Sequence, residues 1–239
     1  MAAKPTIVLV HGAFSDGASW SPVVMRLLGA GAQVRVPAIS GRSLADDATY
    51  VRAFVDRIDG PVLLVGHSYG ATVAGVAGDA ANVRGIVFVE GYVLAAGESA
   101  NDLHARFPDP DALDHLEYAV YPVKNGTDAE EVSVAIDQFP YLTALGIPSD
   151  EAAVLAVTQR PLDAAVLAEP APVAGWKDRP TWGVVATGDL LVNPDAVRDG
   201  FARAGVRDVV ELAGPHLILH THPADVARVI LDAAGSVLR

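Results

Sequence analysis

The sequence lacks cysteine altogether and is poor in positive charge. With no cysteine among its 239 residues, disulfide frameworks, thiolate metal sites and cysteine nucleophiles are excluded. Lysine and arginine number 17 against 29 aspartates and glutamates, which gives a formal net charge of −12. Because nucleic acids and anionic membrane surfaces repel such a charge, we expect neither as a partner.

Long hydrophobic runs are missing as well. No segment reaches the roughly 18–20 consecutive apolar residues that a membrane-spanning helix needs. The early run Thr6–Val10 is too short for the core of a signal sequence, and no small-residue cleavage site follows it. Apolar residues nevertheless make up 51% of the chain, as in a well-packed globular protein. These features predict one large domain, located in the cytoplasm.

The sequence does contain an alternation of strand-like runs and helical patterns. Four short runs in the first half are rich in Val and Ile: 6–10, 33–36, 61–65 and 85–89. Unbroken apolar runs of this kind are typical of parallel strands that are covered on both faces. Helical spacing of apolar residues fills 19–28 and 43–58, and Ser43 is a suitable N-cap for the second helix. The alternation predicts a three-layer α/β domain with a mostly parallel sheet of about six strands.

The alternation stops between Gly91 and about Pro180. This stretch is rich in proline and aromatic residues, and it contains no convincing strand, only helical patterns at 112–119, 129–138 and 150–158. Beyond it, strands are predicted at 181–186 and 208–212, and helices at 195–204 and 223–237. We therefore expect a core formed by residues 1–90 and 181–239, interrupted by a helical cap insertion over residues 91–180.

A G-x-S-x-G motif follows the third predicted strand directly. In Gly66-His67-Ser68-Tyr69-Gly70 the serine falls where a strand turns at once into a small-residue helix. Such a turn strains the backbone of the central residue and exposes its hydroxyl at the carboxyl edge of the sheet. The alternative is the glycine-rich turn of a nucleotide-binding domain, but no G-x-G-x-x-G accompanies it. Ser68 is therefore the predicted nucleophile.

Two backbone N–H groups are needed to stabilise an oxyanion in acyl transfer. One is expected from Tyr69, the residue after the nucleophile. The other is expected from Ala13, in the His11-Gly12-Ala13 loop that follows the first strand. Since the donor is main chain, a small side chain is sufficient there. We expect His11 to brace this loop and His67 to support the site without taking part in the chemistry.

A serine nucleophile needs a histidine base, and the histidine needs an orienting carboxylate. In this arrangement the chain order is serine, acid, histidine, with the last two on loops after later strands. Asp189 ends the predicted strand 181–186 in a turn, and His216 follows the last strand in the same way. Asp189 and His216 are therefore the predicted acid and base.

Several other residues compete for these roles. Glu90, at the end of the fourth strand, is an alternative acid, whereas Asp195 and His222 belong to the starts of helices. His216 and His220 are four residues apart, which is a spacing seen in metal sites, but no H-E-x-x-H pattern accompanies them. We expect no metal and no cofactor.

Together these residues resemble the small single-domain α/β-hydrolases. The likeness is greatest to a bacterial group of cofactor-free, esterase-like enzymes related to plant methyl-ester esterases and hydroxynitrile lyases. It is carried by the opening Ile7–Ala13, the elbow around Ser68, the segment Ala186–Pro194 and His216 with His222-Pro223. Further landmarks are 43–47, 97–99 and 159–161. The resemblance spans nearly the whole chain and is weakest in the insertion.

The resemblance implies the α/β-hydrolase fold, a triad of Ser68, Asp189 and His216, and oxyanion donors at Ala13 and Tyr69. The expected reaction is hydrolysis of a small to medium apolar carboxylic ester through an acyl-enzyme. We expect the substrate to contact residues under or within the cap, namely Phe14, Tyr92 and Trp176. The protein is expected to be a monomer or homodimer whose partner is a small-molecule ester.

Other activities share the same triad. Lactone hydrolysis and cofactor-free perhydrolysis stay open as alternatives. Hydroxynitrile-lyase chemistry is disfavoured, because such relatives have a lysine directly after the histidine and a threonine in the oxyanion loop, where this chain has Leu217 and Ala13. A ligand-binding protein that only retained the fold is also disfavoured, since a degenerate site usually loses a member of the triad.

Overall fold

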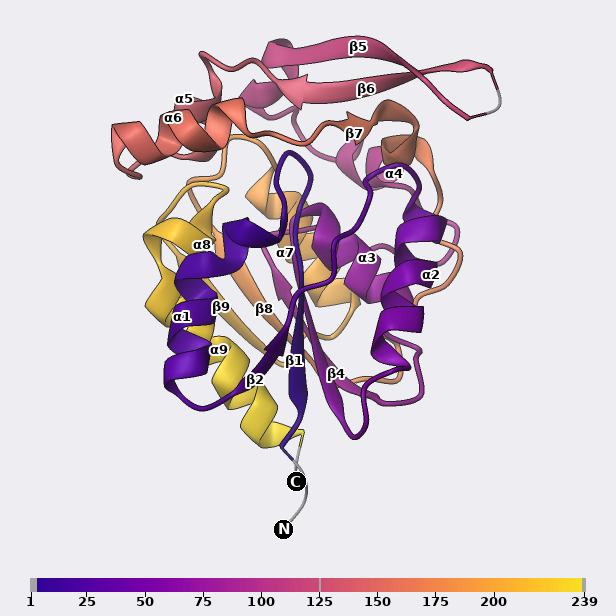
Figure 1. The fold of residues 1–239 in the computed structure, drawn as a ribbon, viewed down its shortest axis with the longest axis vertical. Coiled ribbons are helices and arrows are strands. Elements are labelled where there is room, and N and C mark those ends of the chain that lie inside the picture. The colour runs from indigo at the N-terminus through magenta and orange to yellow at the C-terminus, as the bar shows by residue number, and fades with distance from the viewer. Residues whose placement is uncertain (1–3, 125, 238–239) are drawn as a thin grey trace.

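The sheet at the centre of the molecule consists of six parallel strands (Figure 1). The computed structural model describes residues 4–124 and 126–237. The strand order is β2-β1-β3-β4-β8-β9, and every neighbouring pair is parallel. The strands are β1 Thr6–Val10, β2 Gln33–Arg35, β3 Val62–His67, β4 Val83–Val89, β8 Thr181–Ala186 and β9 Asp208–Leu212. The predicted mostly parallel sheet of about six strands is confirmed.

Helices cover both faces of the sheet, which explains why its strands are apolar at consecutive positions. Val8 and Val10 of β1 belong to the cluster shared with α2, α3 and α7. Ile7 and Leu9, which point the other way, pack with α1, α8 and α9. The helices are α1 Ser21–Gly29, α2 Leu44–Val55, α3 Tyr69–Ala77, α7 Pro194–Arg203, α8 Ile218–Thr221 and α9 Pro223–Ser236. A short 3-10 helix, Gly17–Trp20, precedes α1.

The start of α2 shows how local sequence fixes an element. Ser43 is its N-cap, and the Ser43 hydroxyl accepts a hydrogen bond from the Asp46 amide at 3.2 Å. The carboxylate of Glu169, from the far end of the insertion, accepts from the amides of Leu44 and Ala45 at 2.7 and 3.0 Å. Negative charge at a helix N-terminus is stabilising, so this contact holds the end of the insertion against the core.

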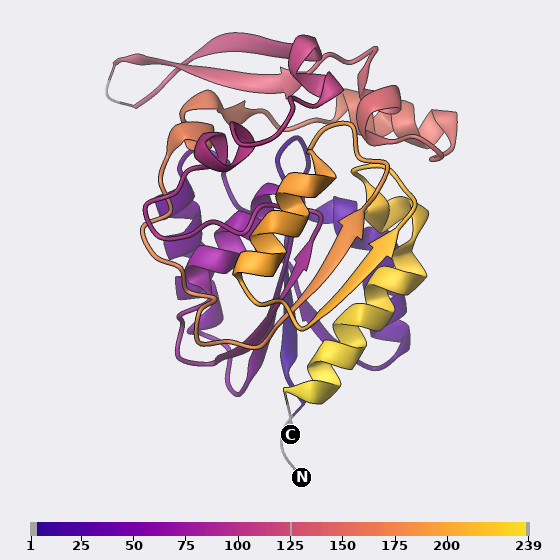
Figure 2. The ribbon, with the colours of Figure 1, turned by 180° about the vertical axis from the view of Figure 1, so that it is seen from behind.

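The order of the strands reverses between β1 and β3. The chain leaves β1 for β2 on one side and then returns to β3 on the other. Such a reversal opens a crevice at the carboxyl ends of the strands, where ligands bind in open α/β sheets. Figure 2 shows the arrowheads of β8 and β9 pointing toward the insertion, so the loops after these strands meet beneath it.

The insertion combines helices with a second, antiparallel sheet of order β5-β6-β7, which lies across the carboxyl edge of the core (Figures 1 and 2). Its elements are α4 Ala100–His104, β5 Leu116–Pro122, β6 Asp128–Val134, α5 Phe139–Thr143, α6 Ser149–Val157 and β7 Leu162–Asp163, with 3-10 helices at Asp111–His115 and Ala164–Ala168. The helix predicted at 150–158 is confirmed by α6. The expectation of a helical insertion with no convincing strand is wrong, because the insertion contains β5, β6 and β7. Of the helix predicted at 112–119, residues 112–115 are helical, as part of the 3-10 helix Asp111–His115, and the rest belongs to β5. The helix predicted at 129–138 is wrong, because residues 128–134 form β6.

The hairpin has a physical basis that the helical pattern concealed. Val132 and Val134 are buried on alternate positions of β6, which is the period of a strand rather than a helix. In the sequence Asn125-Gly126 separates the two runs, and this dipeptide favours a tight hairpin turn. Gly126 has a φ of 75°, a left-handed conformation that glycine adopts without strain.

Within residues 4–124 and 126–237, no helix is long and apolar enough to cross a membrane.

Candidate active site

Ser68 lies on a strained turn between β3 and α3. Its φ is 54° and its ψ is −128°, a conformation that costs free energy in a residue with a side chain. The two glycines of the motif are required by close packing: a Cβ on Gly66 would lie 2.1 Å from the Gly70 oxygen, and one on Gly70 would lie 2.4 Å from the Val10 oxygen. The strand, the helix and β1 therefore meet at this serine without room for larger residues.

A continuous chain of hydrogen bonds joins three residues from distant parts of the sequence. Nε2 of His216 lies 2.9 Å from Oγ of Ser68, and Nδ1 of His216 lies 2.5 Å from Oδ2 of Asp189. All three residues are buried, with exposed fractions of 8% for Ser68, 6% for Asp189 and 3% for His216. The structure thus brings together the serine, histidine and aspartate that the motif order predicts.

Asp189 is oriented by the turn that follows β8. Its Oδ1 accepts hydrogen bonds from the amides of Leu191 and Val192, at 2.7 and 3.0 Å, while Oδ2 faces His216. Backbone donors of this kind hold a carboxyl group in one orientation. The aspartate is therefore placed as a fixed acceptor for the imidazole N–H.

The loop after β1 lies against the nucleophile. A Cβ on Gly12 would lie 2.8 Å from Cβ of Ser68, and the next residues are Ala13 and Phe14, the latter with a positive φ of 58°. Tyr69 opens α3, where an amide has no partner one turn earlier in the helix. Among the described residues, neither the Ala13 amide nor the Tyr69 amide has a backbone acceptor.

Two buried histidines flank the triad. Nε2 of His67 lies 3.0 Å from the carbonyl oxygen of His216, so His67 donates to the backbone of the loop that carries the base. Nδ1 of His11 lies 2.9 Å from the carbonyl oxygen of Gly12. Burial lowers the pKa of His11 and lowers the pKa of His67 well below its usual value, so both are neutral. They brace the loops on either side of Ser68.

The side chain of Tyr69 points away from the reacting groups. Its hydroxyl donates to Oδ2 of Asp47 at 2.9 Å, and Asp47 also accepts from the amides of Ser40 and Gly41 at 2.7 and 2.9 Å. Burial, followed by the charge of Asp47, raises the pKa of Tyr69, which keeps the hydroxyl protonated. This network ties the start of α3 to α2.

An apolar cavity of about 300 Å³ opens beside the triad. The core contributes His216, Leu217 and residues 13–16, 18 and 19 after β1, of which Ser15, Asp16 and Ser19 are polar. The rest of the wall comes from residues of the insertion and neighbouring loops, among them Phe139, Thr143, Val154, Leu155, Thr158 and Leu191. A group attached to a carbonyl at Ser68 can therefore be covered on one side by the core and on the other by α5 and α6.

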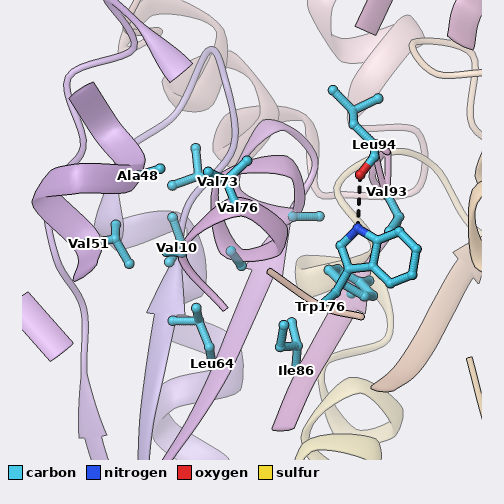
Figure 3. Close-up of a cluster of buried hydrophobic side chains, with 14 of the residues drawn as sticks. Val10, Ala48, Val51, Leu64, Val73, Val76, Ile86, Val93, Leu94 and Trp176 are labelled. Carbon is cyan, nitrogen blue, oxygen red and sulfur yellow. Dashed lines mark hydrogen bonds between the residues drawn. The ribbon is translucent and has the colours of Figure 1, made fainter. Parts of the chain in front are cut away.

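Only one of the three predicted substrate contacts, Phe14, lines this cavity. The Tyr92 hydroxyl instead lies 3.1 Å from Nδ1 of His104. Trp176 packs within the core beside α3, and its indole N–H donates to the carbonyl oxygen of Leu94 at 2.9 Å (Figure 3). Tyr92 and Trp176, which are also predicted to contact the substrate, are thus not among the residues that line this cavity. A large side chain can serve the core as well as a pocket, and composition does not distinguish the two.

The competing residues have other partners. Nδ1 of His220 lies 2.8 Å from a carboxylate oxygen of Glu151, and His222 is the N-cap of α9. Asp195 lies in the first turn of α7, where it pairs with Arg198 at 2.7 Å. Over the described part of the chain, no group of three or more side chains suited to a metal comes together.

A model of the alpha/beta hydrolase family matches residues 7–229 of the sequence. The chain belongs to the alpha/beta hydrolase family. Among curated proteins, no match to this α/β hydrolase is found.

Solved structures of other α/β hydrolases have a similar fold. Polyneuridine aldehyde esterase superposes with a TM-score of 0.83 at 16% identity, over 97% of this chain and 100% of that one. A methylesterase protein, MES16, from Arabidopsis gives a TM-score of 0.80 at 13% identity, over 97% and 99% of the two chains. A pyrethroid hydrolase from Sphingobium faniae JZ-2 gives 0.73 at 19% identity, over 97% and 98%. At these identities the likeness concerns the fold.

Proposed function

We propose that this α/β hydrolase is a serine-dependent carboxylic-ester hydrolase that works through an acyl-enzyme. The observation that carries the proposal is the hydrogen-bond chain from Ser68 through His216 to Asp189, buried at the carboxyl edge of the sheet. A serine hydroxyl is a weak nucleophile until a base removes its proton, and here the base is already within 2.9 Å of it.

In the first half-reaction, Oγ of Ser68 attacks the ester carbonyl carbon while its proton passes to Nε2 of His216. The carbonyl oxygen becomes an oxyanion, which accepts hydrogen bonds from the Ala13 and Tyr69 amides. The imidazolium is stabilised by Asp189, whose Oδ2 accepts from Nδ1. When the tetrahedral intermediate collapses, the alcohol leaves with the proton from Nε2, and the acyl group stays on Ser68.

In the second half-reaction a water molecule replaces the alcohol. His216 removes a proton from this water as it attacks the acyl carbonyl, and the same two amides stabilise the second oxyanion. The acid is released when Ser68 regains its proton. The ester bond is broken and one water is consumed, so no other reactant is needed.

The cavity indicates the kind of ester. Its volume of about 300 Å³ and its mostly apolar wall suit one apolar acyl or alcohol group of small to medium size. The structural neighbours polyneuridine aldehyde esterase, a methylesterase and a pyrethroid hydrolase are, by name, consistent with this reaction class.

The test is hydrolysis of p-nitrophenyl acetate, butyrate and octanoate by the wild type and by Ser68→Ala. We expect the wild type to show a burst of p-nitrophenol equal to the enzyme concentration, and Ser68→Ala to lose the burst and all but a small fraction of kcat. Ser149→Ala, an exposed serine on α6, is the matched control and should behave as wild type. Equal hydrolysis by wild type and Ser68→Ala would refute the proposal.

A further inference from the structure

A second carboxyl group is buried next to the triad. Glu90 directly follows β4, and its exposed fraction is 0%. Its φ is 39°, one of three positive φ values among the described non-glycine residues, all of which lie at the site. The Glu90 carbonyl oxygen accepts from the Ser68 amide at 3.1 Å, so the residue is also part of the nucleophile's own turn. Buried charged groups are rare unless they are paired.

The contacts of the Glu90 side chain leave one oxygen without a donor. Oε2 accepts a hydrogen bond from the amide of Ala186, at the end of β8. Oε1 has no donor among the described residues. Burial raises the pKa of Glu90, and the charge of the neighbouring Asp189 carboxyl and a side-chain hydrogen bond with it raise that pKa further. Two facing carboxyl groups can form a hydrogen bond only if one of them carries a proton.

The donors around each group decide where this proton lies. Asp189 accepts three hydrogen bonds, from the amides of Leu191 and Val192 and from His216, whereas Glu90 accepts one from a backbone amide. A proton on Asp189 would face these N–H donors, whereas Oε1 of Glu90 has no donor among the described residues. The proton that the pair needs is left on Glu90.

We propose that Glu90 is a positioning residue: as a neutral carboxylic acid, it donates a hydrogen bond to Asp189 and holds that carboxylate against His216. This inference rests on the proposed function, because it assigns Asp189 the role of orienting the base. Since Asp189 has backbone donors only at Oδ1, the contact from Glu90 adds a restraint that comes from a different strand of the sheet.

The charges around Glu90 agree with this assignment. Burial, and after it the charge of Asp189, raises the pKa of Glu90 well above its usual value. Arg198 on α7 acts in the opposite direction, but its guanidinium is engaged by Glu211 and Asp195 at 2.8 and 2.7 Å. The Tyr92 hydroxyl nearby is neutral, because burial raises its pKa. His216 contacts Asp189 at Oδ2.

Two substitutions of Glu90 test whether it acts as a neutral hydrogen-bond donor or whether its negative charge is required. Glu90→Gln keeps the shape and places an amide N–H where the acid O–H would be, whereas Glu90→Leu removes every polar atom. We expect Glu90→Gln to keep kcat for p-nitrophenyl butyrate within about threefold of wild type at pH 7, and Glu90→Leu to lose roughly 10- to 100-fold in kcat with little change in KM. If Glu90→Gln were as impaired as Glu90→Leu, the neutral-donor role would be overturned.

Infrared spectroscopy tests the protonation of Glu90 without requiring enzymatic activity, so its result does not depend on the proposed function. The infrared spectrum of the wild type minus that of Glu90→Gln should contain the carbonyl stretch of a protonated carboxylic acid at pH 7. If ester hydrolysis is absent but this band is present, the proposed function fails and the protonated pair stands. If hydrolysis depends on Ser68 but the band is absent, the present inference fails alone.

The pH dependence of stability gives an independent check. A carboxyl whose folded pKa is raised binds more protons in the folded than in the unfolded state, so its contribution to stability falls as pH rises above the unfolded value, about 4.5. Glu90→Gln cannot ionise, so its Tm should rise relative to wild type between pH 5 and pH 9. Glu117→Gln, an exposed carboxyl on β5, is the control whose Tm should stay parallel to wild type. If the Tm of Glu90→Gln and that of the wild type changed in parallel with pH, the proposal would be contradicted.

Discussion

The floor of the active site and the insertion above it are built in different ways. The floor consists of turns at the ends of parallel strands, and its three triad residues are at most 8% exposed. The insertion carries an antiparallel hairpin whose β5 strand is exposed along most of its length. Backbone hydrogen bonds and close packing fix the floor, whereas β5 lies at the edge of its sheet and pairs with β6 alone. The difference suggests that the floor determines the chemistry and the insertion selects the substrate.

The two regions are nevertheless joined beside the triad. The Leu217 amide, next to His216, donates to the carbonyl oxygen of Thr143 in α5 at 2.9 Å. The Ala112 amide donates to the carbonyl oxygen of Leu190, next to Asp189, at 3.1 Å. Because these bonds involve the loops that carry the base and the acid, a substitution has to be tested for effects on both regions.

The largest expected effect is on the floor, at Asp189. Asp189→Asn removes the charge that stabilises the imidazolium and offers His216 a donor in place of an acceptor. We expect kcat to fall by about 10⁴-fold with little change in KM. Asp195→Asn, six residues further on and at the surface, is the matched control. A loss of less than tenfold in steady-state hydrolysis would assign the acid role elsewhere.

The next largest effect is expected from packing at the nucleophile's turn. A methyl group on Gly70 would lie 2.4 Å from the backbone oxygens of Val10 and His11, so Gly70→Ala must displace β1 or α3. Gly70→Ala should cost about 3 kcal/mol or more in the free energy of unfolding, measured with urea. Gly235→Ala in α9, with nothing within 4 Å, should be neutral or slightly stabilising. If Gly70→Ala and the wild type had equal urea midpoints, the turn would not be tightly packed.

Substitutions in the insertion should change selectivity rather than chemistry. Leu155 of α6 lines the cavity, so Leu155→Trp reduces its volume. We expect kcat/KM for the octanoate ester to fall by about tenfold, mainly through KM, while the acetate ester is hardly affected. Val157→Trp, on the same helix but 66% exposed, is the control. A proportional loss for acetate and octanoate would contradict the division of roles.

The smallest effect concerns the buried histidine behind the triad. Since burial lowers the pKa of His67, the unfolded state binds a proton that the folded state excludes, and stability falls as pH drops below about 6.5. His67→Gln has no group that titrates in this range. The difference in free energy of unfolding between His67→Gln and the wild type should therefore shift by about 1.4 kcal/mol in favour of the variant between pH 8 and pH 5.5. Urea unfolding of both proteins at the two pH values measures this shift. If the stability difference between them is the same at both pH values, His67 is not the group that makes the wild type less stable at low pH.

The sequence is informative about the floor because each feature there is local. The turn around Ser68 needs glycines two residues before and after it, and these are visible in the motif. Asp189 and His216 follow from the rule that sites form at the carboxyl ends of parallel strands. The one residue whose importance was not apparent is Glu90, which the sequence suggests only as an alternative acid. Its relation to Asp189 depends on the pairing of β4 with β8.

The insertion could be predicted much less well, because its structure depends on distant contacts. Its short helices and strands have mixed patterns, and β5 has no buried face of its own to impose a period of two. Trp176 and Tyr92 are of residue types that often line pockets. In the structure Trp176 packs with residues of α3, and the Tyr92 hydroxyl contacts His104. Leu155 and Thr143 give no signal in the sequence that sets them apart from other residues of their helices.

The central claim, that Ser68 is an activated nucleophile, is tested most directly by covalent labelling. The folded protein would be treated with a fluorophosphonate and examined by intact-mass and peptide mass spectrometry. We predict one adduct per chain, on the peptide that contains Ser68, and no adduct with Ser68→Ala. An unlabelled wild type, or an adduct that persists in Ser68→Ala, would contradict the claim.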